Sequence, residues 1–424
     1  MLKSWLPVAP NSDFPLENIP FGIFSPESAP DELRAGTIIG NTVIDLQELL
    51  DLGYFDDYEN FGDIYPFVFQ SECLNDFIAE GKAFTRFVRK QIQTIFAAGS
   101  DLEKKENELD ILLYDADEVI MHLPVMIGDY TDFYSSRQHA TNVGMMFRDP
   151  ANALLPNWLH IPVGYHGRAS SIVVSCTDVV RPLGQRLPQG AEVPVFGASQ
   201  LLDFELEVAF IVGAENAMGE RVSTADAEDY IFGLTLFNDW SARDIQAWEY
   251  VPLGPFLGKN FASSMSAWVV TLDALNEFRV AGPAQTDPQI LPYLEYEGKK
   301  HFDIALEVAI QTPAGDEKIV SNSNFKNMYW NMVQQLAHHT VGGCPMRIGD
   351  VCASGTISGD TPESYGSMLE ITWRGSKPIT MPDGTERKFI NDGDTVVMRG
   401  FAEKDGVRIG FGDVSGKILP ALPL

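Results

Sequence analysis

The chain has 424 residues, of which 45% are hydrophobic, and a chain of this length is enough for two or three domains. Its formal net charge of -29 excludes an average surface that attracts nucleic acid or acidic membranes. About 18 consecutive apolar residues without a charge or a proline occur nowhere, so we expect a cytoplasmic protein without a membrane span.

The cysteines indicate neither a zinc ribbon nor a disulfide framework, because none are spaced as C-x-x-C. They are Cys73, Cys176, Cys344 and Cys352. We expect reduced thiols that serve packing.

The N-terminal part begins with a predicted β-hairpin and continues with two predicted helices. Gly40 and Asn41 stand between β-branched runs in residues 37–46, which is typical of a two-residue hairpin turn. Apolar residues recur at helical spacing over residues 84–98, and a charged amphipathic helix is expected over residues 101–114. The composition then changes near Leu123 and Pro124, so we divide the chain into domains 1–123 and 124–424.

The second domain is predicted to be larger and mostly β. Short β-type runs separated by Gly and Pro cover residues 171–174, 204–212, 231–237, 267–272 and 302–310. One helix is expected after Ser323, which can cap it, and before Gly342, which ends it. Residues 182–198 and 282–292 are interpreted as surface loops.

Two alternating carboxylates provide the first candidate site. Glu205 and Glu207 alternate with apolar residues, so on a strand both point to one face, about 6.5 to 7 Å apart. Such a pair can converge on one cation. The alternative is a half-exposed strand whose solvated face carries both charges.

Two further clusters extend this candidate site. Asp239 follows a buried run and precedes Arg243, and residues 129–139 concentrate acids, tyrosines and a histidine around Asp132. If these carboxylates meet, the ligands are all oxygen, which favours Ca²⁺ or Mg²⁺, and Ca²⁺ tolerates several carboxylates better. His139 is the candidate general base, although a structural donor is the open alternative.

Other enzyme classes lack their motifs in this sequence. There is no G-x-S-x-G elbow, the stretch 254–260 lacks the spacing of a phosphate-binding loop, and residues 410–416 miss the dinucleotide pattern. A serine hydrolase, a phosphate-loop enzyme and an NAD enzyme are therefore disfavoured.

Long blocks of the chain resemble the fumarylacetoacetase family. The blocks are residues 128–144, 155–168, 238–246, 248–259 and 353–359, in family order. The resemblance runs over nearly the whole chain and is weakest between about residues 47 and 119. It implies an SH3-like N-terminal β-barrel, a larger β-roll catalytic domain, and a homodimer. It also implies hydrolysis of 4-fumarylacetoacetate to fumarate and acetoacetate, which ends tyrosine and phenylalanine breakdown.

The resemblance further assigns roles by position. The implied ligands of the main metal are Asp132, Glu205, Glu207 and Asp239. The implied base is His139, oriented by Glu370, and the implied oxyanion donors are Arg243, Gln246 and Lys259. Substrate contacts are implied for Tyr134, Arg148, Tyr165, Tyr250 and Thr356, and a second, Mg²⁺ site for Asp239, Lys259 and Ser263.

The chemistry agrees with these roles. A dianionic substrate in so acidic a protein requires local positive charge, which Arg148, Arg243, Lys259 and a cation supply. The metal would hold the leaving enolate, and water would be activated by the histidine and glutamate. The alternatives are acylpyruvate hydrolysis or oxaloacetate decarboxylation on the same scaffold, or a Ca²⁺-binding protein without catalysis.

Overall fold

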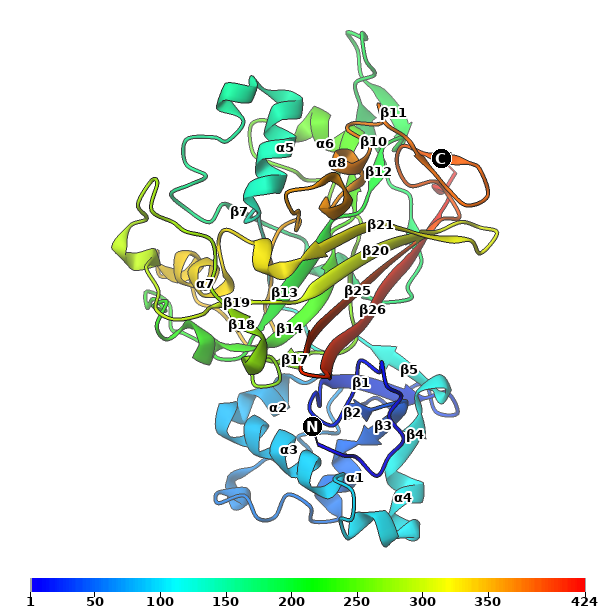
Figure 1. The fold of residues 1–424 in the computed structure, drawn as a ribbon, viewed down its shortest axis with the longest axis vertical. Coiled ribbons are helices and arrows are strands. Elements are labelled where there is room, and N and C mark those ends of the chain that lie inside the picture. Colours follow the sequence, from blue (N-terminus) through cyan, green and yellow to red (C-terminus); the bar gives the residue numbers. More distant parts are fainter. Residues whose placement is uncertain (1, 424) are drawn as a thin grey trace.

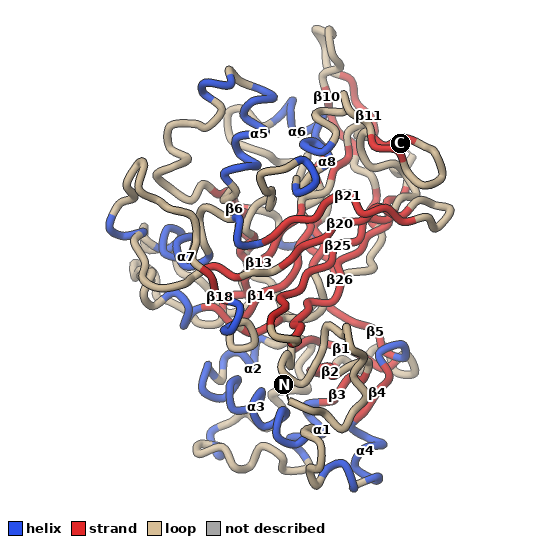
Figure 2. The backbone as a smooth tube through the Cα atoms, in the orientation of Figure 1, coloured by secondary structure: helices blue, strands red, loops and turns tan. Residues whose placement is uncertain are grey.

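A computed structural model describes residues 2–423 of the chain. Figure 1 shows a small N-terminal domain, coloured blue to cyan, beneath a larger C-terminal domain. Strands occupy the middle of the large domain and most helices lie around them (Figure 2). The expected fold class, mostly β with a small first domain and a larger mixed second one, is confirmed.

The N-terminal sheet is antiparallel and has the strand order β4-β3-β2-β1-β5. Its strands are β1 (Phe21–Pro26), β2 (Arg34–Ile39), β3 (Thr42–Asp45), β4 (Leu113–Asp115) and β5 (Val119–His122). The expected hairpin is confirmed, because β2 pairs with β3. Its turn contains Gly40 at φ 62°, which a residue without a side chain adopts easily.

Helices flank this sheet. They are α1 (Leu46–Asp51), α2 (Asn75–Ala79), α3 (Gly81–Ile95) and α4 (Glu106–Leu112). The helix expected over residues 84–98 is confirmed as α3, which buries Phe84, Val88 and Ile92. The helix expected over residues 101–114 is wrong in part, because its end becomes β4, where Leu113 pairs with Ile44 of β3.

An eight-stranded sheet with the order β7-β6-β22-β13-β14-β16-β8 and β17 beside β14 forms the centre of the large domain. Its strands are β6 (Tyr130–Phe133), β7 (Gly164–His166), β8 (Ile172–Val174), β13 (Leu206–Val212), β14 (Ile231–Asn238), β16 (Ser263–Met265), β17 (Val270–Thr271) and β22 (Val351–Ala353). Both faces of β13 are buried. Val208 and Phe210 contact the C-terminal core, whereas Ala209 and Ile211 face the N-terminal domain. This explains why its sequence is a nearly continuous apolar run.

A second sheet, in the order β21-β20-β25-β26-β9, packs over the first. Its strands are β9 (Val179–Val180), β20 (Ala305–Gln311), β21 (Glu317–Asn324), β25 (Thr395–Lys404) and β26 (Val407–Leu419). Leu306, Val308 and Met398 point into the shared core. The two layers hold the ends of the central strands in fixed places.

The remaining helices and short strand pairs surround these layers. They are α5 (Arg137–Phe147), α6 (Arg243–Glu249), α7 (Met332–Thr340), α8 (Met368–Ile371), β10 (Leu183–Arg186) with β11 (Val195–Ala198), β12 (Leu202–Asp203) with β15 (Ser241–Ala242), β18 (Arg279–Val280) with β19 (His301–Phe302), and β23 (Ile379–Thr380) with β24 (Glu386–Arg387). The helix cap expected at Ser323 is wrong, since Ser323 lies in β21 and Asn331 caps α7. The loop expected over residues 182–198 contains the hairpin β10–β11.

The boundary between residues 123 and 124 stays a prediction. It falls just after β5, yet the apolar core is continuous across it, because Phe77 of α2 packs on Phe232 of β14 with ring centroids 6.1 Å apart. Within residues 2–423 no helix is long and apolar enough to cross a bilayer.

Candidate active site

Four carboxylates meet where strands of the central sheet end. Asp132 lies in β6, Glu205 directly precedes β13, Glu207 lies in β13, and Asp239 follows β14. One oxygen of each lies within 4.8 Å of the others, and all four residues are buried. The solvated-face alternative for Glu205 and Glu207 is therefore wrong.

Strand register explains the convergence. Antiparallel pairing sets Leu206 opposite Asn238, which brings Glu205 and Glu207 to the end of β14 and to Asp239. On the other side of β13, β22 pairs in parallel with β6, so that Ala353 lies opposite Asp132. Residues more than 100 positions apart thus form one site.

Two cationic side chains, Lys259 and Arg243, neutralise part of this cluster. Lys259 donates to Glu205 and, at 2.5 Å, to Asp239, while Arg243 Nη1 lies 2.8 Å from Glu205 Oε1. Burial alone would raise the pKa of Glu205, but Lys259 and Arg243 hold it well below its usual range. The neighbouring carboxylates likewise outweigh burial at Lys259 and raise its pKa, so it stays charged.

Asp132 and Glu207 are the carboxyl groups of the cluster whose ionisation the site disfavours. Burial, and then the neighbouring carboxylates, raise the pKa of both groups well above their usual range. Asp132 Oδ1 and Glu207 Oε1 are buried and have no hydrogen-bond partner among the described residues. Buried oxygens without partners and an all-carboxylate donor set fit a hard divalent cation, which would supply the missing positive charge.

These pKa shifts predict that metal stabilises the protein more at higher pH. Without metal, folding favours the protonated forms of Asp132 and Glu207. The stability that this preference contributes is fully present below their ordinary pKa values of 3.8 and 4.5, and it is lost as pH rises through the raised values. Metal binding replaces those protons. We expect the increase in Tm caused by Ca²⁺ to be larger at pH 8 than at pH 5.5 in thermal unfolding experiments. An equal increase at both values would contradict this reading.

A histidine and a glutamate form a second, adjoining group. His139 lies in the first turn of α5, where Ser136 caps the helix by accepting from the His139 amide at 3.2 Å. His139 Nδ1 lies 2.7 Å from Glu370 Oε2 in α8. An ionised carboxylate can only accept, so Nδ1 carries the proton and Nε2 has a free lone pair. Glu370 thus holds His139 in the tautomer that a general base needs.

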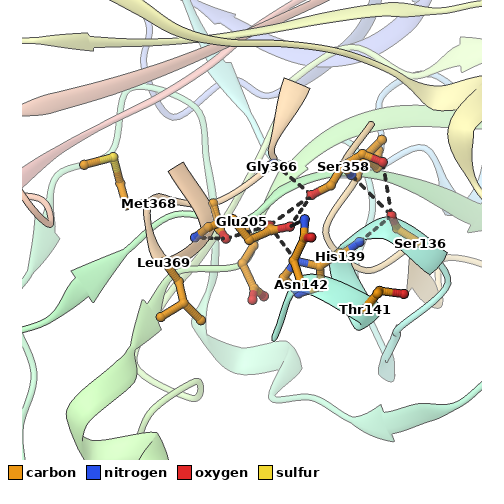
Figure 3. A network of polar contacts seen from close by, with 12 residues as sticks. Ser136, His139, Thr141, Asn142, Glu205, Ser358, Gly366, Met368 and Leu369 are labelled. Atoms are coloured by element: carbon orange, nitrogen blue, oxygen red, sulfur yellow. Dashed lines mark hydrogen bonds and ion pairs between the residues drawn. The ribbon is translucent and has the colours of Figure 1, made fainter. Parts of the chain in front are cut away.

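Other donors keep Glu370 ionised. Asn142 donates to it at 2.9 Å, Ser367 at 2.9 Å, and Ser358 at 2.9 and 3.0 Å to its two oxygens. Figure 3 labels Asn142 and Ser358 beside His139. Burial would raise the pKa of Glu370, but His139 and these donors bring it below its usual value. Sequence reasoning missed these three donors. Two had local signals, since Asn142 follows His139 by one helical turn and Ser367 precedes Glu370 as a helix cap does.

The predicted oxyanion donors lie beside the carboxylates. Arg243 Nη2 is buried and has no partner among residues 2–423, so it is available to a substrate oxygen. Gln246 Oε1 accepts from Arg243 Nη1 at 3.4 Å, which leaves the amide NH₂ group to donate. Ser263 Oγ donates to Asp239 Oδ1 at 3.0 Å, and its role at a metal site stays a prediction.

The predicted substrate residues are not all brought together. Tyr134, whose ring lies 5.2 Å from that of His139, lines a cavity of about 70 Å³ together with Arg148, which is exposed. Tyr165 donates to Asp239 at 2.8 Å and to Asp132 at 3.2 Å. Thr356 is buried, whereas Tyr250 is 52% exposed and its hydroxyl bonds to no described residue. The substrate roles stay predictions.

Comparison with known proteins gives consistent matches. Residues 17–124 match the family model described as Fumarylacetoacetase N-terminal, and residues 129–418 match the one described as Fumarylacetoacetate (FAA) hydrolase C-terminal. Among similar curated proteins, Fumarylacetoacetase from Homo sapiens is 50% identical over 421 residues, covering 99% of both chains. That from Caenorhabditis elegans is 51% identical over 425 residues, covering 99% of this chain and all of the other.

A solved structure gives a likeness of fold alone. The fumarylacetoacetate hydrolase from Exiguobacterium antarcticum superposes with a TM-score of 0.52 at 17% identity, covering 95% of this chain and 99% of that one.

Proposed function

This chain belongs to the fumarylacetoacetase family, and from that premise we propose that it hydrolyses 4-fumarylacetoacetate to fumarate and acetoacetate, the last step of tyrosine and phenylalanine breakdown. One observation carries the proposal: the His139–Glu370 pair, with a free Nε2, adjoins a buried cluster of four carboxylates. Glu205 of that cluster pairs with Ser367 in a β-bridge, and Ser367 donates to Glu370.

Water is the attacking group. His139 Nε2 takes one proton from it, and Glu370 stabilises the imidazolium through Nδ1. The hydroxide bonds to the fumaryl carbonyl carbon, and the oxyanion that forms accepts from Arg243 Nη2 and the Gln246 amide. The carbon–carbon bond then breaks, its electron pair leaves with the acetoacetate unit as an enolate, and the imidazolium returns the proton to carbon.

The cation belongs to the same proposal, with Ca²⁺ at the main site. Asp132, Glu205, Glu207 and Asp239 would hold it, because they offer only oxygen ligands and several charges. When bound, a divalent cation supplies Lewis-acid stabilisation of the enolate oxygen.

A second site for Mg²⁺ beside Asp239, Lys259 and Ser263 has weaker support. The ammonium group of Lys259 has no lone pair, so that residue can offer only its carbonyl oxygen. Metal analysis of the protein as purified tests both identities.

A homodimer is proposed as well. The loop after α6 exposes Val251 by 67%, Leu253 by 96% and Phe256 by 66%, and a group of exposed apolar side chains is typical of an interaction surface. Sedimentation at micromolar concentration tests this, and a monomer mass would contradict it.

A cytoplasmic location completes the proposal. It is supported by four cysteines whose thiols are free, and cell fractionation tests it.

The deciding experiment follows fumarylacetoacetate consumption by its ultraviolet absorbance, and the products by chromatography. We expect turnover that chelator abolishes and added Ca²⁺ restores, because the buried carboxylates repel one another without a cation. Acylpyruvate and oxaloacetate serve as control substrates. If either is consumed while fumarylacetoacetate is not, the function proposed here is wrong and the scaffold performs the alternative reaction.

A further inference from the structure

Asp203 has no solvent exposure, and it belongs neither to the four clustered carboxylates nor to the His139–Glu370 pair. It ends β12, where it pairs with Ser241 of β15, and it precedes Glu205 by two residues. Its carboxylate has three partners. Oδ1 accepts from the Met368 amide at 2.7 Å, and Oδ2 accepts from the Leu369 amide at 3.0 Å and from Arg243 Nε at 2.8 Å.

The first two partners are the opening amides of α8. This helix has only four residues, so it leaves most of its amides without partners of its own. Asp203 accepts from the first two, and the cap Ser367 accepts from the third, the amide of Glu370. The place of Glu370, and thus of the proton acceptor for His139 Nδ1–H, depends on this anchoring.

The third partner is Arg243, the first residue of α6. Arg243 binds Asp203 through Nε and Glu205 through Nη1, which leaves Nη2 without a partner in the described part of the chain. An ion pair at 2.8 Å fixes the plane of the guanidinium group, and hence the direction in which Nη2 points. Figure 3 draws Met368, Leu369 and Glu205 in the same close-up as His139.

We propose that Asp203 is a positioning residue, which aligns the helix bearing Glu370 and the guanidinium of Arg243 with each other for the reaction. This inference rests on the proposed function. Asp203 touches neither the reacting atoms nor the cation in this account, and it acts through two groups that do.

The test is Asp203→Asn, which keeps the shape of the side chain but presents an NH₂ group to partners that are all donors. We expect kcat to fall by about 10²-fold, as for a displacement of about 1 Å in a catalytic group, with KM and bound metal little changed. In the Glu370→Gln background, Asp203→Asn should lower kcat by a much smaller factor, because the two residues act as a unit.

Asp394 provides a matched control. It too is fully buried, it pairs with Arg387 at 2.7 and 2.9 Å, and it accepts the Asn391 amide at 2.9 Å. Asp394→Asn should lower Tm as Asp203→Asn does, yet leave kcat within a factor of about three, since it loses a comparable pair without moving a catalytic group.

The outcomes separate this inference from the proposed function. Wild-type protein without turnover contradicts the proposed function. Active wild type combined with an unchanged kcat in Asp203→Asn overturns the positioning role, as does an equal loss in the Glu370→Gln background. If Asp203→Asn does not fold, Asp203→Glu, which keeps the charge but moves it by one methylene, takes its place in the same comparison. Failure of both to fold makes Asp203 a folding residue and overturns the proposal.

Discussion

Replacing His139 with alanine lowers kcat by about 10²- to 10⁴-fold, the usual contribution of a general base. Bound metal stays unchanged, because His139 is not one of the four clustered carboxylates. The reason for the loss is that Glu370 no longer holds an imidazole whose Nε2 can accept a proton from water. Steady-state kinetics and metal analysis on the same preparation measure the two quantities.

His301 is the matched control for this prediction. It is also a buried histidine, and among residues 2–423 its ring makes one hydrogen bond, from Nε2 to the Met328 carbonyl at 3.0 Å. His301→Ala loses stability in the same way but retains kcat, since no catalytic group contacts it. Equal turnover in His139→Ala and wild type would remove His139 from the mechanism.

Replacing Glu207 with glutamine lowers metal affinity by more than about 100-fold, because even a change outside the ligand shell costs 10- to 100-fold. The metal-free protein becomes more stable at neutral pH, with a higher Tm than metal-free wild type. The cause is that burial and the neighbouring Asp239 and Glu205 already disfavour the charge of Glu207, and the amide removes it. Calorimetric titration with Ca²⁺ and thermal unfolding measure the two effects.

Glu307 provides a control with the same local sequence. The residues Leu-Glu-Val-Ala occur at 206–209 and again at 306–309, but Glu307 binds Arg399 at 2.8 Å in the second sheet. Glu307→Gln should leave Ca²⁺ affinity unchanged. If Glu207→Gln binds Ca²⁺ as tightly as wild type, the four carboxylates are not the metal site.

Local sequence predicted the elements whose cause is local. The turn at Gly40 needs a residue that tolerates positive φ, and α3 follows from apolar residues spaced by one helical turn. Alternation alone placed Glu205 and Glu207 on one face of a strand. Family resemblance added the pairing of His139 with Glu370, which are 231 residues apart and which no spacing connects.

Longer-range pairing decided the elements that were predicted wrongly. Residues 113–115 continue a helical pattern, but hydrogen bonds to β3 make them a strand. Ser323 is a good helix cap by residue type, yet it lies in β21 and pairs with Leu306 of β20. The turn-rich stretch 182–198 forms a hairpin because the backbone groups of β10 and β11 hydrogen-bond to each other.

The sequence by itself determined the chemistry available to this protein. It supplies carboxylates that alternate with apolar residues, a histidine in a polar segment, and a net negative charge that requires local cations around an anionic substrate. Only the tertiary structure decided what those groups can do. Alternation alone leaves open whether Glu205 and Glu207 face solvent or form a cation site. The strands β14 and β6 decide this, because they bring Asp239 and Asp132 to the two glutamates and bury all four. The role of Asp203 is likewise set by distant partners, because a buried carboxylate acquires its function from the donors that the fold places around it.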